Sequence, residues 1–543
     1  MRAGDRERSL ERLDRAAARV EPVFVAVAAI AAAAVILFVT GPHGPALSPD
    51  SAAYLSAAES FADGEGLTKY GGEVMVHFPP GFPLLLAALV ELFEASAVAA
   101  GRVANAVLLG LITGAAWLVL RRLATSATIR LLGVTVVASA TSLHLVSSYA
   151  WSEPLFVFTS LFALLALNEA IRWPYDVGWL VVAALAAGSC FLIRYIGVVV
   201  IVTGSVAILV GGWRQLSGWR RLTRAAVFAM VASAGPVAWV VRNLSVSDTA
   251  TGGRGPAEAS LAENAYDAVR GVGVLLVPEA APVRGLVLLL LCAVAVAAVL
   301  QVRSTGLGGA RRFAWLLAGF VALYVVVLVV SASTTSVYPL KDRLLSPIFV
   351  PLVALAAALL DRAAVGWRER HGPYRALLGP GALALCAAGL VWGSAEVGST
   401  TADGVDYAGQ RWRDSDLIAT VERTDLPATV YSNVPGGLFL RASIDARCWP
   451  HELVLGDRCN GFATTSDGVE EQIGTDPAAL IVFSPDRAGE RPTVEIPDTL
   501  RVTRTIDTAD GSMYLLRPVS KRRAHRVANA TQLRHRQRAE KEK

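Results

Sequence analysis

Two acidic residues stand at places in the sequence where a carboxylate could act as a general base. Asp50 follows the first long apolar stretch, in LSPDSAAYLSAAESF, and Glu153 follows another, in SSYAWSEPLF. Ser48 can cap a helix and Pro49 suits its first position, so Asp50 falls in the first turn, where it also complements the helix dipole. Tyr54 lies four residues later, on the same helix face. Asp50 is therefore either a helix-stabilising residue or a base for a reacting hydroxyl group.

Four cationic residues lie near the ends of apolar stretches. They are Arg194 in CFLIRYIGVVVIV, Arg242 in WVVRNLS, and Lys341 and Arg343 in SVYPLKDRLLSP. Such side chains can extend to the membrane surface and be solvated there. Outer loops are normally poor in Arg and Lys, however, and fixed cations bind phosphate well. Together with the two carboxylates they suit a lipid-phosphate ligand whose head group reacts with a polar acceptor. A carboxylate would take the acceptor proton, and the cations would stabilise the charge on the leaving phosphate.

His77 opens HFPPGFP, where two prolines and a glycine build a rigid turn without helical hydrogen bonds. The imidazole is either part of this turn or a group that points into a site.

Two of the five cysteines, Cys448 and Cys459, stand close together in RCWPHELVLGDRC. An oxidising compartment and a short loop favour a disulfide between them. A metal pair with His451 is the alternative, but no CxxC spacing occurs.

The composition is that of a polytopic membrane protein. The chain has 543 residues, of which 54% are hydrophobic and only 17% are charged, and its mean hydropathy is +0.48. Soluble domains of this length have a lower hydrophobic fraction and a higher charged fraction. The chain also contains repeated apolar runs of about 17–20 residues, which are long enough to cross a bilayer as helices. The net charge of +5 therefore does not indicate nucleic-acid binding. In a membrane protein, Arg residues gather in the cytoplasmic loops, and their distribution indicates the topology.

The apolar runs predict eleven transmembrane helices with a cytoplasmic N-terminus. The predicted spans are roughly 23–40, 99–120, 131–148, 154–170, 177–193, 196–212, 225–241, 285–302, 313–331, 345–361 and 376–393. The predicted cytoplasmic loops are rich in Arg, whereas the opposite loops carry most of the acidic residues. FPPGFPLLLAALVELFEAS has an apolar part of only about twelve residues, so it is predicted to be an interfacial helix in the first outer loop. The segment that carries Asp50 is predicted to be a second interfacial helix, because Leu55, Ala58 and Phe61 can rest on the membrane surface.

The pattern changes after about residue 394. LPATVYSN, PAALIVFS and SMYLLRP are typical of strands, and RDSDLIATVERT between them is typical of a helix. The predicted parts are a cytoplasmic segment (1–22), a transmembrane domain (23–394), an extracytoplasmic α/β domain (395–518) and a basic disordered tail (519–543).

In these motifs the sequence resembles the GT-C-fold glycosyltransferases, in particular the branch of protein O-mannosyltransferases and aminoarabinose transferases. The resemblance covers most of residues 20–395. Its blocks are Asp50-x-x-x-Tyr54, FPPGFPLLLAAL, VLRRLA, SEPLFVFTSLFALLAL, FLIRYIGVVV, VVRNL and KDRLLSPIFVPLVALAA, in this order.

The resemblance implies an inverting membrane glycosyltransferase that uses a polyprenyl-phosphate sugar. It places the catalytic residue on Asp50 and the second acidic residue on Glu153, with a divalent cation (Mg²⁺ or Mn²⁺) left open. Six residues would bind substrate: Tyr54, His77, Arg194, Arg242, Lys341 and Arg343. The acceptor would be an envelope glycan, a lipid or a protein at the outer face of the plasma (inner) membrane. A transporter or flippase of a lipid-linked sugar, or a non-catalytic binder, is the alternative. Transporters usually carry ionisable groups near mid-membrane and show repeated halves, which this sequence does not.

Overall fold

A computed structural model gives the fold of the chain. The residues that it describes are 3–211, 216–276, 309–336, 340, 342–368, 398, 403–449, 476–484 and 494–519. The chain forms two compact units, one made of Met1–Ala46 and Met75–Asp403 and the other of Leu47–Val74 and Gly404–Lys543. The segment 47–74 therefore folds with the C-terminal part of the chain.

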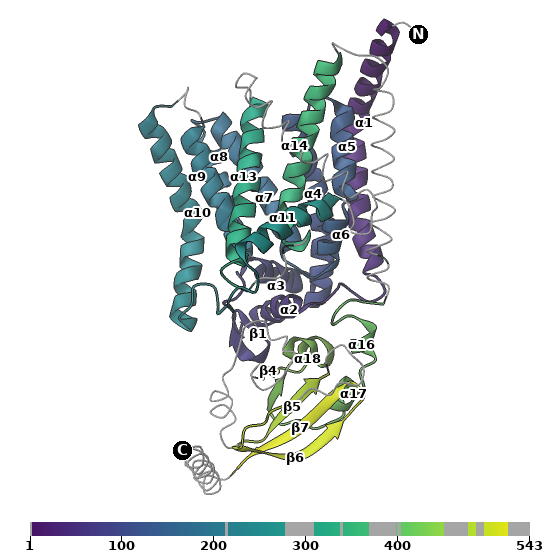
Figure 1. Ribbon diagram of the computed structural model, residues 1–543, viewed down its shortest axis with the longest axis vertical. Helices are drawn as coiled ribbons and strands as arrows, with labels where there is room; N and C mark the ends of the chain where they lie inside the picture. The colour runs from purple at the N-terminus through teal and green to yellow at the C-terminus, as the bar shows by residue number, and fades with distance from the viewer. Residues whose placement is uncertain are drawn as a thin grey trace, which may run out of the picture. The chain divides into compact units, whose positions relative to one another are not determined.

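Long apolar helices make up the first unit (Figure 1). Seven helical stretches among the described residues are long and apolar enough to cross a membrane, which takes about 20 residues. They are Ala17–Val39 in α1 (Ala3–Val39), α4 (Ala97–Leu123), Ala127–Ser148 in α5 (Ala127–Ala138) and α6 (Thr141–Ser148), α7 (Glu153–Arg172), α10 (Gly218–Ser247), α13 (Gly309–Ala332), and Arg343–Arg362 in α14 (Asp342–Arg368).

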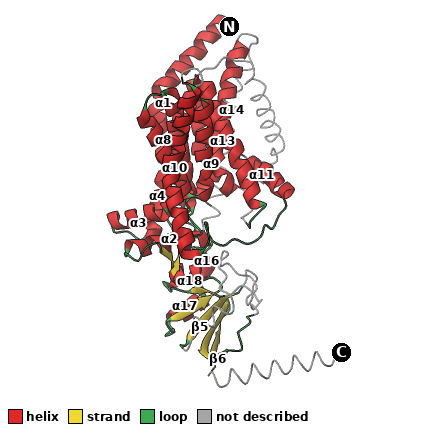
Figure 2. Cartoon of the chain, turned by 90° about the vertical axis from the view of Figure 1, so that its left-hand side faces the viewer, coloured by secondary structure: helices red, strands yellow, loops and turns green. Residues whose placement is uncertain are grey.

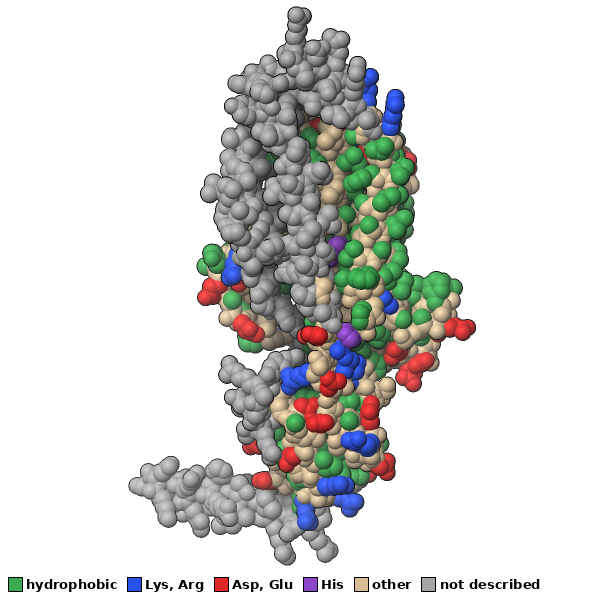
Figure 3. Space-filling model, turned by 90° about the vertical axis from the view of Figure 1, so that its right-hand side faces the viewer, with side chains coloured by type: hydrophobic (Ala, Val, Ile, Leu, Met, Phe, Trp, Pro, Cys, Tyr) green, Lys and Arg blue, Asp and Glu red, His purple; other side chains and the backbone are tan. Residues whose placement is uncertain are grey.

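The outer faces of these helices are apolar. On α1, for example, Val27, Ile30 and Phe38 are 59%, 70% and 83% exposed. Figure 3 shows hydrophobic side chains along one flank of the first unit, where charged side chains are few. A surface of this kind suits contact with lipid.

A tight turn separates two shorter helices, α8 (Val177–Ile193) and α9 (Val198–Val210). Arg194 ends α8, as the sequence predicts, and a 3-10 turn (Tyr195–Gly197) follows it. A Cβ atom at Gly197 would lie 2.2 Å from the carbonyl carbon of Cys190. Only glycine allows the chain to turn back so closely against α8.

Nine of the eleven predicted spans coincide with helices among the described residues, while 285–302 and 376–393 lie outside them. The predicted span 131–148 is two helices, α5 and α6, because the backbone leaves the helix at Ser139. The Ser139 hydroxyl donates to the carbonyl of Thr135 at 2.8 Å, a bond that competes with the helical pattern. The two predicted interfacial helices are α3 (Gly81–Phe93) and α2 (Pro49–Ala62), and their positions relative to a membrane stay predictions. Of the α2 residues expected on the membrane surface, Leu55 and Ala58 are buried and Phe61 is exposed. Another helix, α11 (Leu261–Leu276), was not predicted.

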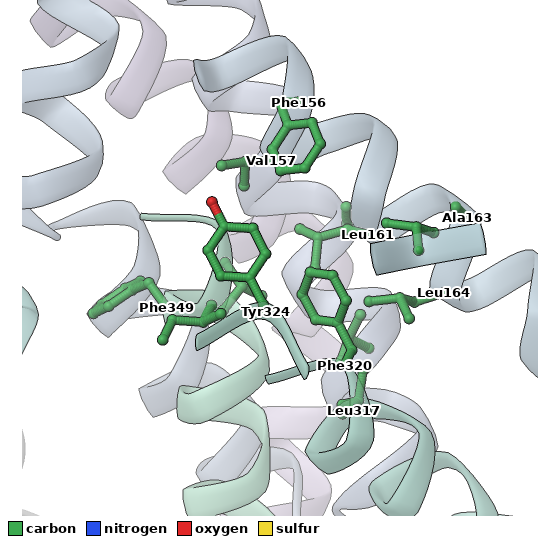
Figure 4. Close-up of a cluster of buried hydrophobic side chains, with 14 of the residues drawn as sticks. Phe156, Val157, Leu161, Ala163, Leu164, Leu317, Phe320, Tyr324 and Phe349 are labelled. Atoms are coloured by element: carbon green, nitrogen blue, oxygen red, sulfur yellow. The ribbon is translucent and has the colours of Figure 1, made fainter. Parts of the chain in front are cut away.

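The core of the bundle joins α7, α13 and α14. Phe320 and Tyr324 of α13 lie beside Phe156 of α7 (Figure 4). The ring centroid of Tyr324 is 5.7 Å from that of Phe320 and 6.4 Å from that of Phe156. The Tyr324 hydroxyl donates to the carbonyl of Leu344 at 2.9 Å. This packing fixes the N-terminal ends of α7 and α14 relative to one another.

Buried polar contacts join the loop between α4 and α5 to other helices. The Asp361 carboxylate on α14 accepts hydrogen bonds from the Thr125 amide and hydroxyl at 2.8 Å and from the Ser126 amide at 3.0 Å. Glu21 of α1 pairs with Arg130 of α5 at 2.6 Å. Ser126 is the N-cap of α5, so the Asp361 carboxylate satisfies an amide that the helix leaves unpaired.

The second unit contains a mixed five-stranded sheet, ordered β4-β3-β5-β7-β6. The strands pair in parallel from β4 to β5 and antiparallel from β5 to β6. Their bounds are β3 Thr429–Ser432, β4 Arg447–Cys448, β5 Ala478–Phe483, β6 Leu500–Asp507 and β7 Gly511–Pro518. The strand predictions for LPATVYSN, PAALIVFS and SMYLLRP are confirmed.

Short helices accompany this sheet (Figure 2). They are α16 (Gln410–Arg413), α17 (Asp416–Glu422) and α18 (Pro435–Ala442), and α17 confirms the helix predicted in RDSDLIATVERT. The unit also holds α2 (Pro49–Ala62) and a small hairpin, β1 (Thr68–Lys69) and β2 (Glu73–Val74). All six side chains of β5 are buried, as expected for a central strand covered on both faces.

Candidate functional site

The site centres on Glu153, whose carboxylate binds two arginines from distant parts of the chain. Its Oε1 atom lies 2.7 Å from Nη1 of Arg194 and 2.5 Å from Nε of Arg343. The Glu153 side chain is 1% exposed, and those of Arg194 and Arg343 are 18% and 15% exposed. Three of the residues predicted to form a site are thus brought together.

Helix ends position the three side chains. Glu153 is the first residue of α7 and Arg194 caps the C-terminus of α8, so each charge is favoured by the dipole of its own helix. Arg343 lies in the first turn of α14, where the dipole disfavours a cation. The ion pair with Glu153 compensates for that unfavourable position.

An aromatic pair supports Arg343. The central guanidinium carbon lies 3.8 Å from the ring centroid of Trp151, and Tyr149 stacks on Trp151 with centroids 3.7 Å apart and an angle of 15°. Asn105 of α4 is fully buried, and its Nδ2 donates to the carbonyls of Tyr149 at 2.7 Å and Trp151 at 3.0 Å. These residues were not predicted from the sequence, although the aromatic pair in SSYAWSEP stands shortly before Glu153.

The trio carries an excess of positive charge, since two guanidinium groups surround one carboxylate. Arginine has five N–H donors in a planar fork whose geometry matches phosphate. The Oε2 atom of Glu153 is buried and accepts no hydrogen bond from the residues that the structure describes. The two guanidinium groups beside one carboxylate, and not this oxygen, suit an anionic ligand.

A divalent cation does not fit at Glu153 in this arrangement, because its carboxylate already faces two positive charges. Among the described residues no group of three or more His, Cys, Asp or Glu side chains could hold a metal ion.

Arg242 belongs to a second group of residues, which holds the backbone before His77. Its Nη1 donates to the carbonyl of Met75 at 2.6 Å, and its guanidinium carbon lies 4.6 Å from the ring centroid of Trp239. The Tyr195 hydroxyl donates to the carbonyl of Val76 at 2.6 Å. Arg242 thus fixes the approach to α3, and its predicted contact with a lipid phosphate stays a prediction.

His77 is packed between an aromatic ring and a backbone turn. Its imidazole lies edge-on to Phe78, with centroids 4.9 Å apart. A Cβ atom at Gly252, where φ is +82°, would lie 2.9 Å from the Cα atom of His77. The close approach of this loop accounts for the glycine.

Comparison with known proteins gives the fold a name. No protein-family model and no curated protein matches the chain. The solved structure of ArnT from Cupriavidus metallidurans in the apo state covers 93% of this chain and 99% of its own length, with a TM-score of 0.57 at 16% identity. Archaeal oligosaccharyltransferase AglB from Archaeoglobus fulgidus, in complex with an inhibitory peptide and a dolichol-phosphate, has a TM-score of 0.50 at 12% identity, with 85% and 70% coverage.

Arabinofuranosyltransferase AftD from Mycobacteria also has a TM-score of 0.50, at 15% identity over 92% of this chain and 40% of its own. All three neighbours are GT-C-fold glycosyltransferases. This chain has the GT-C fold.

In this GT-C chain the predicted catalytic residue Asp50 lies on α2 of the second unit, with Tyr54 one turn later. The predicted start of the helix is confirmed, because Ser48 is the N-cap and Pro49 is the first residue. The Ser48 hydroxyl accepts from the Ser51 amide at 3.3 Å, and the Ser51 hydroxyl accepts from the Ser48 amide at 3.1 Å. The two units are described separately, so a shared site of Asp50 and Glu153 stays a prediction.

Two further predicted residues of the GT-C chain, Lys341 and Cys459, lie outside the described residues. Cys448 takes part in a disulfide, and its pairing with Cys459 stays a prediction.

Proposed function

We propose that this protein is a membrane glycosyltransferase that moves a sugar from a polyprenyl-phosphate donor to an acceptor hydroxyl. The observation that carries the proposal is the buried trio of Glu153, Arg194 and Arg343 within a GT-C fold. A second solved structure of ArnT, with a TM-score of 0.57, is bound to undecaprenyl phosphate, and the AglB complex contains a dolichol-phosphate. We therefore propose a lipid phosphate as the ligand of the two arginines.

In the proposed reaction the arginines act on the leaving group. Arg194 and Arg343 would bind the phosphate through charge-assisted hydrogen bonds. The acceptor oxygen attacks the anomeric carbon, the bond from that carbon to the phosphate oxygen breaks, and its electron pair leaves with the lipid phosphate. Because positive charge close to that oxygen stabilises the developing negative charge, it lowers the barrier. Attack from the side opposite the leaving group inverts the anomeric centre.

Asp50 is the proposed general base. Its carboxylate would take the acceptor proton as the new bond forms. Glu153 would hold the two arginines in place, since its carboxylate is paired with both. His77, Tyr54, Arg242 and Lys341 are proposed to contact substrate.

The surroundings of the reaction follow from the predicted topology. The donor and the acceptor, an envelope glycan, a lipid or a protein, would meet at the outer face of the plasma (inner) membrane. The N-terminus would be cytoplasmic and the α/β domain extracytoplasmic. The sugar would be a hexose or a pentose.

A reconstituted transfer assay tests this function against its alternatives. Purified protein in nanodiscs would be given a panel of labelled polyprenyl-phosphate hexoses and pentoses together with candidate glycan, lipid and peptide acceptors. A glycosyltransferase releases free polyprenyl phosphate and labels an acceptor. A flippase, tested in liposomes, moves the intact donor between leaflets, and a pure binder does neither.

A further inference from the structure

The segment that carries Asp50 is fixed to the C-terminal part of the chain at three points, all within the second unit. The first point is Leu47, three residues before Asp50. The Tyr407 amide donates to the Leu47 carbonyl at 2.9 Å, and the Leu47 amide donates to the Val405 carbonyl at 3.5 Å. These bonds make a parallel bridge between Leu47 and Asp406, so the chain enters α2 along a fixed path.

The second point is a close approach of two helices at Gly436. A Cβ atom at this position of α18 would lie 2.8 Å from the Cβ of Ala52 on α2, and 3.4 Å from ring atoms of Tyr70. Real Cβ atoms essentially never come that close, and the Ala52 methyl group has no rotamer by which to move away. Ala52 is fully buried and stands two residues after Asp50. Only glycine at 436 therefore allows α18 to pack on α2 as it does.

The third point lies at the far end of the segment. The Gly71 amide donates to the Asp445 carboxylate, and Gly71 has a φ of +78°, which favours glycine. The preceding residue, Tyr70, faces Phe439 of α18 with ring centroids 6.2 Å apart. Its amide donates to the Ser56 hydroxyl of α2 at 3.1 Å, which connects this end back to the helix.

We propose that the C-terminal α/β unit is a positioning domain for Asp50, and that Gly436 is its main positioning residue. The inference rests on the proposed function, in which Asp50 is the base. Arg194 and Arg343, which would bind the donor phosphate, belong to the first unit. A disturbance of the contact between α18 and α2 should therefore change the catalytic step and leave donor binding intact.

A suppressor experiment in the full-length protein tests this role. In Gly436→Ala the new methyl group displaces α2, and a misplacement of about 1 Å can cost about 100-fold in rate. We expect kcat to fall at least tenfold while the KM for the polyprenyl-phosphate sugar stays within twofold. The second change Ala52→Gly removes the opposing methyl group. This second change should reverse most of the fall in kcat and most of the fall in melting temperature caused by Gly436→Ala.

The neighbouring glycine provides the matched control. A Cβ atom at Gly437 would meet the ring of Trp412 at 2.6 Å rather than α2, so Ala52→Gly should not rescue Gly437→Ala. An unchanged kcat in Gly436→Ala would overturn the proposal, as would a double variant no better than the single one. Failure of the wild-type protein to transfer sugar from any donor would remove the proposed function itself and this inference with it.

Discussion

Arg343 lies on the face of Trp151, with its guanidinium carbon 3.8 Å from the ring centroid, while its Nε donates to Glu153 at 2.5 Å. One cation is thus held by a ring and by a carboxylate at once. Side chains restrained from two sides lose little entropy when they bind a ligand.

Replacement of Trp151 should weaken donor binding. Trp151 holds Arg343 in place before the donor binds, and ordering a free side chain costs about 0.5–1.5 kcal/mol. Trp151→Leu should therefore raise the KM for the polyprenyl-phosphate donor by up to about tenfold, since 1.4 kcal/mol is a factor of ten. Trp151→Phe keeps a ring and should have a smaller effect. The control is Trp173→Leu, because Trp173 makes a similar contact with Arg172 at 5.3 Å outside the site. Equal KM values for Trp151→Leu and the wild type would contradict the role given to the ring.

Glu153 and Glu169 stand at the two ends of α7, and both are buried, but their arginine partners differ in exposure. Glu153 pairs with two arginines that are 18% and 15% exposed, whereas Glu169 pairs with Arg122 and Arg172, which are 38% and 54% exposed. Breaking a pair that is buried on both sides leaves charges uncompensated and costs about 3–5 kcal/mol. Water screens the more exposed arginine partners of Glu169, so breaking those pairs should cost less.

Glu153→Gln should therefore lower the unfolding midpoint in detergent far more than Glu169→Gln does. Thermal unfolding of both variants beside the wild type checks this comparison. A smaller shift for Glu153→Gln than for Glu169→Gln would show that the trio is not the buried cluster described here.

Lys69 should make the free energy of unfolding of the second unit depend on pH in the alkaline range. Its side chain is 5% exposed and its Nζ lies 2.7 Å from Glu73. Burial lowers the pKa of Lys69 below its usual 10.5, and the carboxylate of Glu73 only partly opposes this. Between the lowered value and 10.5 the unfolded chain binds more protons than the folded one, so this residue's contribution to stability rises with pH in that window.

Lys69→Met removes that contribution. The wild type should gain stability relative to Lys69→Met as the pH approaches 10.5, and should lose this gain as the pH falls through the lowered pKa. Unfolding of the two proteins at several alkaline pH values measures the difference. A difference that stays constant with pH would contradict the expected shift.

Local rules predicted several parts of the site. The start of α2 follows from Ser48, Pro49 and Asp50, whose residue types are sufficient to specify a capped helix. Arg194 marked the end of α8 because an arginine between two apolar halves seldom lies inside a span. The strands of the second unit follow from short β-branched runs between turn residues.

The contacts between distant residues did not follow from the sequence. Asn105 lies in the middle of an apolar helix, and nothing in its neighbours indicates that it holds the carbonyls of Tyr149 and Trp151. Nothing in the sequence distinguishes Gly436 from the other glycines either. Its role follows only from the packing of α18 against Ala52. The packing of segment 47–74 on residues 404–449 depends on tertiary contacts that no periodicity records.

The role of Asp50 can be tested most directly by comparing Asp50→Asn with the wild type in two measurements, binding of the polyprenyl-phosphate sugar and single-turnover transfer to an acceptor. Asparagine keeps the shape of the side chain but takes no proton. General-base catalysis contributes about 10²–10⁴-fold, so transfer should fall by about three orders of magnitude while the Kd for the donor stays the same. Transfer at the wild-type rate, with only the stability of α2 reduced, would show that Asp50 serves the helix and not the reaction.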